Sequence, residues 1–123
     1  MRNLAAIARA LADETRIRAL LALQGRELCL CQLIELLGLA TSTVSKHMAV
    51  LQQTGLVHRR KVGRWAYFRL PGDEAPQVVQ MALVWVRENA AKDSTVREDT
   101  RRLREITRAD QEALCRRQRP RPL

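Results

Sequence analysis

The sequence predicts a mainly helical chain that carries one small β-hairpin. Apolar residues recur at helical spacing between Leu4 and Leu51, which indicates four short helices. All five glycines fall between periodic segments, and no proline occurs before Pro71. The first half therefore consists of helices joined by tight turns. After Gly55 the pattern changes to β-prone runs, which predicts the hairpin.

The first two predicted helices follow from apolar spacing and one capping residue. The first helix has an apolar face made of Leu4, Ile7, Ala8 and Leu11. The second helix is expected to begin after Asp13, whose side chain suits an N-cap, and to end near Gly25. Its inward residues are Ile17, Leu20 and Leu21.

A third and a fourth helix are separated by one short turn. The third has an apolar stripe and closes at Gly38; the stripe consists of Leu30, Leu33, Ile34 and Leu37. Thr41 or Ser42 is expected to cap the fourth helix, which ends at Gly55 and turns Val44, Met48 and Leu51 inward. Two short helices joined in this way predict a helix-turn-helix.

The segment after the helix-turn-helix is a basic hairpin. The runs 56–62 and 65–70 flank Gly63-Arg64, which is a hairpin signal. A basic hairpin in this position is the wing of a winged helix-turn-helix.

Residues 77–91 then form a helix that is apolar almost all round, which one subunit can hardly bury. We therefore expect a homodimer that pairs through this helix and the N-terminal helix.

The chain divides into two parts. Residues 1–92 are expected to hold the winged helix-turn-helix and the dimerisation surface, and 93–123 a charged extension that is partly helical and then a disordered basic tail. No apolar run approaches the roughly 18 residues that a membrane span needs. Arg9 and Asp13-Glu14 interrupt the N-terminal segment, so it does not match a signal peptide. We expect a cytoplasmic protein.

The positive charge is concentrated on the helix-turn-helix and hairpin. The chain has 22 Lys and Arg against 13 Asp and Glu, a net charge of +9. Residues 41–70 carry six bases and no acid. This concentration is typical of a polyanion-binding face. Three of the only four aromatic residues sit together, which argues against a protein that stacks single-stranded bases along a groove. Duplex DNA is the expected partner.

The candidate DNA-binding residues lie on the fourth helix and the hairpin. With the apolar residues inward, the helical period turns the hydroxyl and basic side chains toward base edges and phosphates. The helix N-terminus also favours an anion. The alternative is an ordinary solvated face, but the acid-free hairpin favours DNA. The expected contacts are Ser42, Thr43, Ser45, Lys46 and His47 in the helix, and Arg59, Arg60, Lys61 and Arg64 holding phosphates from the hairpin.

Two thiols separated by one residue are the second signal. Cys29 and Cys31 offer soft ligands for thiophilic ions. On a regular helix their side chains would point about 200° apart, so they can share one ion only if the chain is extended or unwound there. The alternative is two small buried thiols. Cys115 makes the cysteine count odd, and a structural disulfide framework is not expected in a cytosolic chain.

Several ordered motifs over most of residues 4–90 resemble the ArsR/SmtB family. They are L-A-D-E-T-R at 11–16, E-L-C-L-C-Q-L at 27–33, S-K-H-M-A-V-L at 45–51, G-L-V at 55–57 and G-R-W-A-Y-F-R-L at 63–70. The resemblance implies a homodimeric winged-helix repressor that metal or metalloid releases from DNA. The cysteine motif is similar to the E-L-C-V-C-D-L pattern of the arsenic-responsive branch, whose thiolates bind As(III) or Sb(III). Cys29 and Cys31 are the ligands that this resemblance implies.

Departures from the family pattern leave the third ligand open. Some arsenic repressors have a third cysteine where this chain has Ile34, so two sulfurs suffice, an exogenous thiol completes the site, or Cys115 is recruited. The zinc-sensing branch uses Asp and His on a long C-terminal helix, and no histidine follows His58. The cadmium and lead branch adds N-terminal cysteines, and none precedes Cys29.

The sequence thus predicts an arsenic-resistance repressor that binds operator DNA as a dimer and is released when As(III) or Sb(III) binds its thiolates. A second hypothesis keeps DNA binding and makes the thiols sense another soft metal, such as Cd or Pb, or oxidation. A third is a thiol enzyme or metallochaperone. No phosphate loop, His/acid pattern or catalytic strand accompanies the thiols, so we expect no enzyme and no catalytic cofactor.

Overall fold

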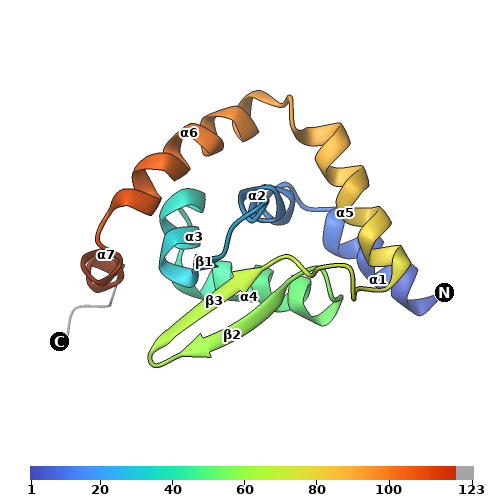
Figure 1. The fold of residues 1–123 in the computed structure, drawn as a ribbon, viewed down its shortest axis with the longest axis horizontal. Helices are drawn as coiled ribbons and strands as arrows, with labels where there is room; N and C mark the ends of the chain where they lie inside the picture. Colours follow the sequence, from blue (N-terminus) through green and yellow to red (C-terminus); the bar gives the residue numbers. More distant parts are fainter. Residues whose placement is uncertain (119–123) are drawn as a thin grey trace.

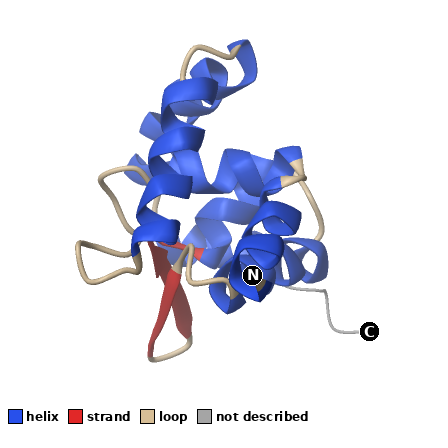
Figure 2. Cartoon of the chain, turned by 90° about the vertical axis from the view of Figure 1, so that its right-hand side faces the viewer, coloured by secondary structure: helices blue, strands red, loops and turns tan. Residues whose placement is uncertain are grey.

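The computed structural model describes residues 1–118, which form a helical body with a small antiparallel sheet along one edge (Figure 1 and Figure 2). The prediction of a mainly helical chain with a hairpin wing is confirmed. Within these residues, no helix is long and apolar enough to cross a membrane. The elements are α1 (Arg2–Leu11), α2 (Glu14–Ala22), β1 (Leu28–Cys29), α3 (Leu30–Leu37), α4 (Thr41–Gln53), β2 (His58–Val62), β3 (Trp65–Arg69), α5 (Gln77–Ala90), α6 (Ser94–Arg108) and α7 (Gln111–Gln118).

The N-terminal helices form where their apolar spacing predicts them, but Leu4 and Ala8 of the predicted α1 face are exposed in the single chain. Asp13 is the N-cap of α2, and its carboxylate accepts a hydrogen bond of 3.1 Å from the Arg16 amide. Leu20 of α2 is completely buried, and Ile7 of α1 packs into the same core. The core continues into α3 and α4, where Leu33 is also fully buried.

The helix-turn-helix consists of α3 and α4. Gly38 closes α3 in the left-handed conformation, with φ of +67°, which glycine adopts without the steric cost of a side chain. The predicted N-cap of α4 was wrong: Ala40 occupies that position, and Thr41 is the first helical residue. The helix begins earlier because the Val44 amide bonds to the Ala40 carbonyl at 3.0 Å. This frame buries the inward face of α4, made of Val44, Met48 and Leu51.

The wing is a hairpin of β2 and β3 that turns at Gly63, as predicted. A third strand, β1, was not predicted. It pairs antiparallel with β3 and sets Cys29 opposite Tyr67, so the strand order is β1-β3-β2. Two residues are too few to show the alternation that identifies a strand in a sequence. Through β1 the wing is attached to the chain segment that carries the first cysteine.

Two helices occupy the part of the extension that the structure describes. Figure 1 shows α6 crossing above α2 and α3, and α7 at the far end beside α3. Leu103 and Ile106 of α6 are buried against the core, as is Leu114 of α7. We predicted a helix followed by a basic tail over 93–123. Residues 116–118 belong to α7, and 119–123 lie outside the described residues.

Arginine side chains hold α6 in place. Arg18 of α2 forms a bidentate pair with Asp99 of α6, at 2.8 and 2.9 Å, and the Asp99 carboxylate is almost fully buried. Arg102 donates to the carbonyls of Leu36 and Glu35 at the end of α3, at 2.8 and 3.0 Å. These carbonyls have no partner within α3 itself, so α6 supplies the missing donors.

One apolar strip remains uncovered. Val79 and Val86 of α5 are buried, whereas Met81 and Trp85 are each 62% exposed. Leu4 of α1 is 57% exposed and lines the same groove between α1 and α5. The helix predicted to be apolar all round therefore carries a large unburied apolar surface next to α1.

Candidate functional site

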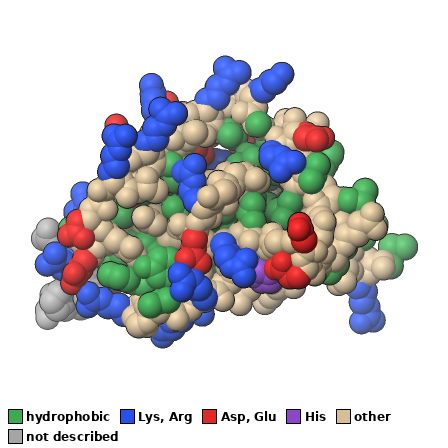
Figure 3. Space-filling view, in the orientation of Figure 1, with side chains coloured by type: hydrophobic (Ala, Val, Ile, Leu, Met, Phe, Trp, Pro, Cys, Tyr) green, Lys and Arg blue, Asp and Glu red, His purple; other side chains and the backbone are tan. Residues whose placement is uncertain are grey.

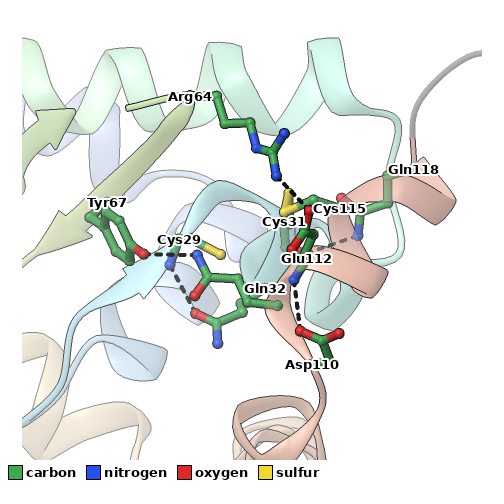
Figure 4. The surroundings of a disulfide bond; sticks show 10 residues. Cys29, Cys31, Gln32, Arg64, Tyr67, Asp110, Glu112, Cys115 and Gln118 are labelled. Carbon is green, nitrogen blue, oxygen red and sulfur yellow. Dashed lines mark hydrogen bonds and ion pairs between the residues drawn. A yellow bond between two sulfur atoms is a disulfide. The ribbon is translucent and has the colours of Figure 1, made fainter. Parts of the chain in front are cut away.

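Three cysteines from three elements meet at one place. Cys29 lies in β1, Cys31 in the first turn of α3, and Cys115 in α7 (Figure 4). Their sulfur atoms all lie within 4.8 Å of one another. Cys31 and Cys115 form a disulfide, and Cys29 is a buried free thiol. After reduction, this cluster would offer three soft donors to a single ion.

The two neighbouring cysteines converge because the backbone changes conformation between them. Cys29 is extended, with φ of −81° and ψ of 162°, and acts as the N-cap of α3. The helix starts at Leu30, so the divergence expected on a regular helix does not apply. The Gln32 side chain accepts a hydrogen bond of 2.9 Å from the Cys29 amide and fixes this entry. The chain is thus extended at Cys29, which meets the condition for Cys29 and Cys31 to share one ion.

The position of Cys115 differs from the prediction. A mobile-looking tail was expected, but Cys115 sits on a helix and is only 8% exposed. The expectation that the cysteines form no structural disulfide was also wrong, since Cys31 pairs with Cys115. Gln118 adds a hydrogen bond of 2.9 Å from its side chain to the Cys31 carbonyl. The apolar packing of α7, led by Leu114, brings the third sulfur to the site.

The environment of Cys29 favours the neutral thiol. The residue is 1% exposed, and burial raises the pKa of its thiol, although hydrogen bonds from the backbone of Gln32 and Cys31 oppose the shift. A buried site of this kind disfavours an uncompensated negative charge.

The predicted DNA-reading residues lie on one face of α4. Ser42, Thr43 and Lys46 are exposed, and Ser45 is half-buried. His47 is also half-buried, and its Nδ1 accepts a hydrogen bond of 3.1 Å from Arg16 of α2. The hydroxyl and lysine side chains are therefore free to approach a duplex, while His47 is tied to the scaffold.

The four predicted phosphate-binding cations of the wing fall into two classes. Arg59 and Lys61 are exposed on β2. Arg60 forms a bidentate pair with Glu27 at 2.6 and 2.8 Å, which lowers the pKa of the Glu27 carboxyl. Arg64 at the turn pairs with Glu112 of α7 at 2.7 Å. Two of the four cations thus already have acidic partners.

Sequence reasoning missed the polar residues that connect these sites. Gln111 donates a hydrogen bond of 2.9 Å to the Tyr67 hydroxyl. Glu112 pairs with Arg64 at the turn of the wing (Figure 4). Gln111, Cys115 and Gln118 share one helix face by their spacing of four and three residues. The sequence shows this spacing, but it does not show which part of the protein this face of α7 packs against.

Basic side chains also occur outside the wing. Figure 3 shows Lys and Arg gathered along the upper edge of the molecule, over α6. The exposed arginines of α6 include Arg97, Arg101, Arg104 and Arg108. Since α4 and the hairpin lie below α2 and α3 in the same orientation, these arginines belong to a separate surface (Figure 1).

The family described as "Bacterial regulatory protein, arsR family" matches residues 13–59. A cadmium resistance transcriptional regulatory protein CadC homolog of Staphylococcus aureus is 33% identical over 91 residues, covering 72% of this chain and 74% of that protein. The arsenic resistance transcriptional regulator ArsR1 of Pseudomonas putida is 42% identical over 74 residues. That match covers 59% of this chain and 57% of ArsR1.

Solved structures agree with these sequence matches. The homodimeric winged helix-turn-helix DNA-binding domain of a Mycobacterium bovis protein, described as a possible ArsR-family transcriptional regulator, superposes with a TM-score of 0.58. It is 27% identical, and the match covers 72% of this chain and 82% of that domain. With a winged helix-turn-helix, an exposed polar α4 face and these relatives, the chain belongs to the ArsR family of DNA-binding bacterial transcriptional regulators.

Proposed function

We propose that this protein is a homodimeric repressor that binds operator DNA and releases it when As(III) or Sb(III) binds Cys29, Cys31 and Cys115. The observation that carries the proposal is the meeting of three sulfur atoms within 4.8 Å. Trivalent arsenic and antimony prefer three thiolate donors in a pyramidal arrangement. The sequence motif supplied two donors, and the packing of α7 against α3 supports the third.

The charge balance of the site supports a trivalent metalloid. Three thiols react with As(OH)₃ to form three As–S bonds and three waters, so the product is neutral and no net proton is released. The same three thiolates around Cd²⁺ or Pb²⁺ would carry a net charge of −1. Burial that raises the pKa of Cys29 also penalises that charge. The relatives include both arsenic and cadmium regulators, so the relatives alone do not identify the inducer. The charge of the bound site favours a trivalent metalloid over a divalent metal.

Metalloid binding requires the reduced protein. A dithiol reductant that becomes a disulfide gives two electrons and two protons to Cys31–Cys115 and yields two thiols. With Cys29, these complete the set of three ligands.

The DNA-binding half of the proposal uses α4 and the wing. Two protomers paired through the strip on α1 and α5 would set their α4 helices in successive major grooves, about 34 Å apart, on an imperfect palindrome. Ser42, Thr43, Ser45 and Lys46 would read or clamp the groove. His47, whose Nδ1 accepts a hydrogen bond from Arg16, would donate from Nε2 to a phosphate. Arg59 and Lys61 would hold phosphates directly, and Arg60 and Arg64 would do so on leaving their partners Glu27 and Glu112.

The test compares DNA release by arsenite in cysteine variants. A duplex selected by the metal-free protein from a random pool is labelled, and its affinity is measured by fluorescence anisotropy under reducing conditions. Arsenite should release the wild type, whereas Cys29→Ser/Cys31→Ser and Cys115→Ser should bind the duplex normally and stay bound. Unchanged arsenite-driven release from Cys29→Ser/Cys31→Ser would overturn the assignment.

The disulfide supports a second candidate, a repressor that senses thiol oxidation. Hydrogen peroxide would take two electrons and two protons from Cys31 and Cys115, becoming two waters and leaving the disulfide. Release by peroxide without release by arsenite would favour this function over the first. Stronger release by Cd²⁺ than by arsenite would instead favour a divalent-metal sensor.

A further inference from the structure

Two wing cations are held by carboxylates that neighbour the thiol ligands. Glu27, which pairs with Arg60, precedes Cys29 by two residues. Glu112, which pairs with Arg64, precedes Cys115 by three residues on α7. The carboxylates that hold these two wing cations are therefore close in sequence to two of the thiol ligands.

Helix α7 contacts both partners through adjacent side chains. Cys115 and Gln118 face α3, where they meet the sulfur and the carbonyl of Cys31. In the first turn of the same helix, Gln111 bonds to Tyr67 of β3. Glu112 pairs with Arg64 at the hairpin turn (Figure 4). One short helix thus bridges the candidate inducer site and the turn of the hairpin.

We propose that α7 is a clamp that inducer binding closes on the wing, so that Glu112 withdraws Arg64 from the DNA backbone. The inference rests on the proposed function and names how that site controls DNA binding. Bonds from one metalloid to Cys29, Cys31 and Cys115 would fix α7 against α3 and hold Glu112 at the hairpin turn. The inducer then favours the clamped state because its three ligands lie together there, with their sulfur atoms within 4.8 Å of one another.

The weakness of the Arg64–Glu112 pair makes it suitable for such control. The two side chains are 55% and 53% exposed, and an ion pair this open contributes little by itself. In the reduced protein without inducer, α7 is held only by non-covalent packing, and a phosphate can therefore compete for Arg64. Once bonds to Cys115 hold α7, Glu112 stays at high effective concentration near Arg64. Glu112 then outcompetes the DNA phosphate for the Arg64 guanidinium. Its carboxylate also repels phosphate at close range.

The test uses full-length Glu112→Gln, with Glu98→Gln as the matched control. Both changes remove one exposed carboxylate that pairs with an arginine, but Glu98 pairs with Arg101 within α6, away from the wing. Arsenite binding is followed by the ultraviolet absorption of the As–S bonds. DNA affinity is measured with and without arsenite over a series of salt concentrations, and circular dichroism verifies folding.

The clamp predicts that Glu112→Gln keeps arsenite binding but loses most of the DNA release that arsenite causes. Both variants should bind arsenite like the wild type, but arsenite should release Glu112→Gln at least several-fold less than Glu98→Gln. In the wild type and the control, arsenite should also reduce the salt slope of DNA binding by about 0.9 per protomer, the contribution of one phosphate contact. In Glu112→Gln the slope should not change.

The possible failures can be told apart. If arsenite binds Glu112→Gln and releases it as fully as Glu98→Gln, the clamp is wrong and the proposed function stands. If the wild type binds no arsenite, or binds it without releasing DNA, the proposed function fails and the clamp fails with it. Loss of arsenite binding in Glu112→Gln would also overturn the clamp, because Glu112 would then act on the inducer site itself.

Discussion

At the scale of single residues, the backbone conformation of Cys29 decides what the cysteine motif can do. Cys29 ends an extended segment and Cys31 begins a helix, so their sulfurs point to one place. Sequence spacing identified this condition but could not decide whether the chain meets it. The deciding contact is the hydrogen bond from the Cys29 amide to the Gln32 side chain.

The buried thiol of Cys29 should react slowly with alkylating reagents. In the oxidised protein it is the one free cysteine, since Cys31 and Cys115 are paired. Because burial raises the pKa of Cys29, the reactive thiolate should be scarce at neutral pH and increase only as the pH rises above the ordinary thiol pKa. Iodoacetamide labelling followed by mass spectrometry across pH gives the midpoint. A midpoint at or below the value for free cysteine would contradict the expected shift.

Lys46 should contribute affinity for any duplex. It is exposed on α4 beside the hydroxyl residues, so Lys46→Ala should weaken binding to all sequences and reduce the salt slope by about 0.9 per protomer. The control is Arg104→Ala on α6, which also removes one exposed cation but lies on the opposite side of the core (Figure 1). Anisotropy titrations at several salt concentrations measure both quantities. If DNA affinity depends equally on salt in the two variants, Lys46 does not contact DNA.

At the scale of elements, the helices and hairpin could be predicted, but β1 and the docking of α7 could not. Apolar spacing, Asp13 and Gly38 define α1 to α4 locally, because each helix carries its own period and terminators. The contacts of α7 depend on residues 84 positions apart, such as Cys31 and Cys115, and no local pattern encodes such a distance. The third sulfur donor therefore emerged only from tertiary packing.

The buried pair of Arg18 and Asp99 should anchor α6. Asp99→Asn removes the carboxylate that receives two hydrogen bonds from Arg18, whose pKa the hydrogen bond raises. The half-buried guanidinium would be left without its counter-charge, so we expect a loss of about 2 kcal/mol in the free energy of unfolding.

Urea denaturation of Asp99→Asn and Glu98→Gln measures this anchoring. The control removes the neighbouring carboxylate, which forms an exposed pair and should cost under about 1 kcal/mol. Equal stability of the two variants would show that α6 is held by apolar packing alone.

At the scale of the whole molecule, an apolar strip and a basic face lie in different places. The strip on α1 and α5 is at one end of the molecule, whereas α4 and the hairpin line the lower edge in Figure 1. A symmetric pair joined through the strip leaves both α4 faces open. Dimerisation and DNA binding can therefore be tested by separate substitutions.

Trp85→Glu should convert the proposed dimer into monomers. Trp85 is 62% exposed in the single chain, and a two-fold interface would bury both copies. Losing an aromatic anchor costs about 2 kcal/mol, so two copies should raise the dimer dissociation constant roughly a thousandfold. Sedimentation velocity measures this change, with Thr100→Glu on the exposed face of α6 as the control for added charge.

The monomer should bind one half-site with its normal salt slope and lose affinity for the full palindrome, because the second half-site no longer adds its avidity. A Trp85→Glu protein that remains dimeric would place the interface elsewhere.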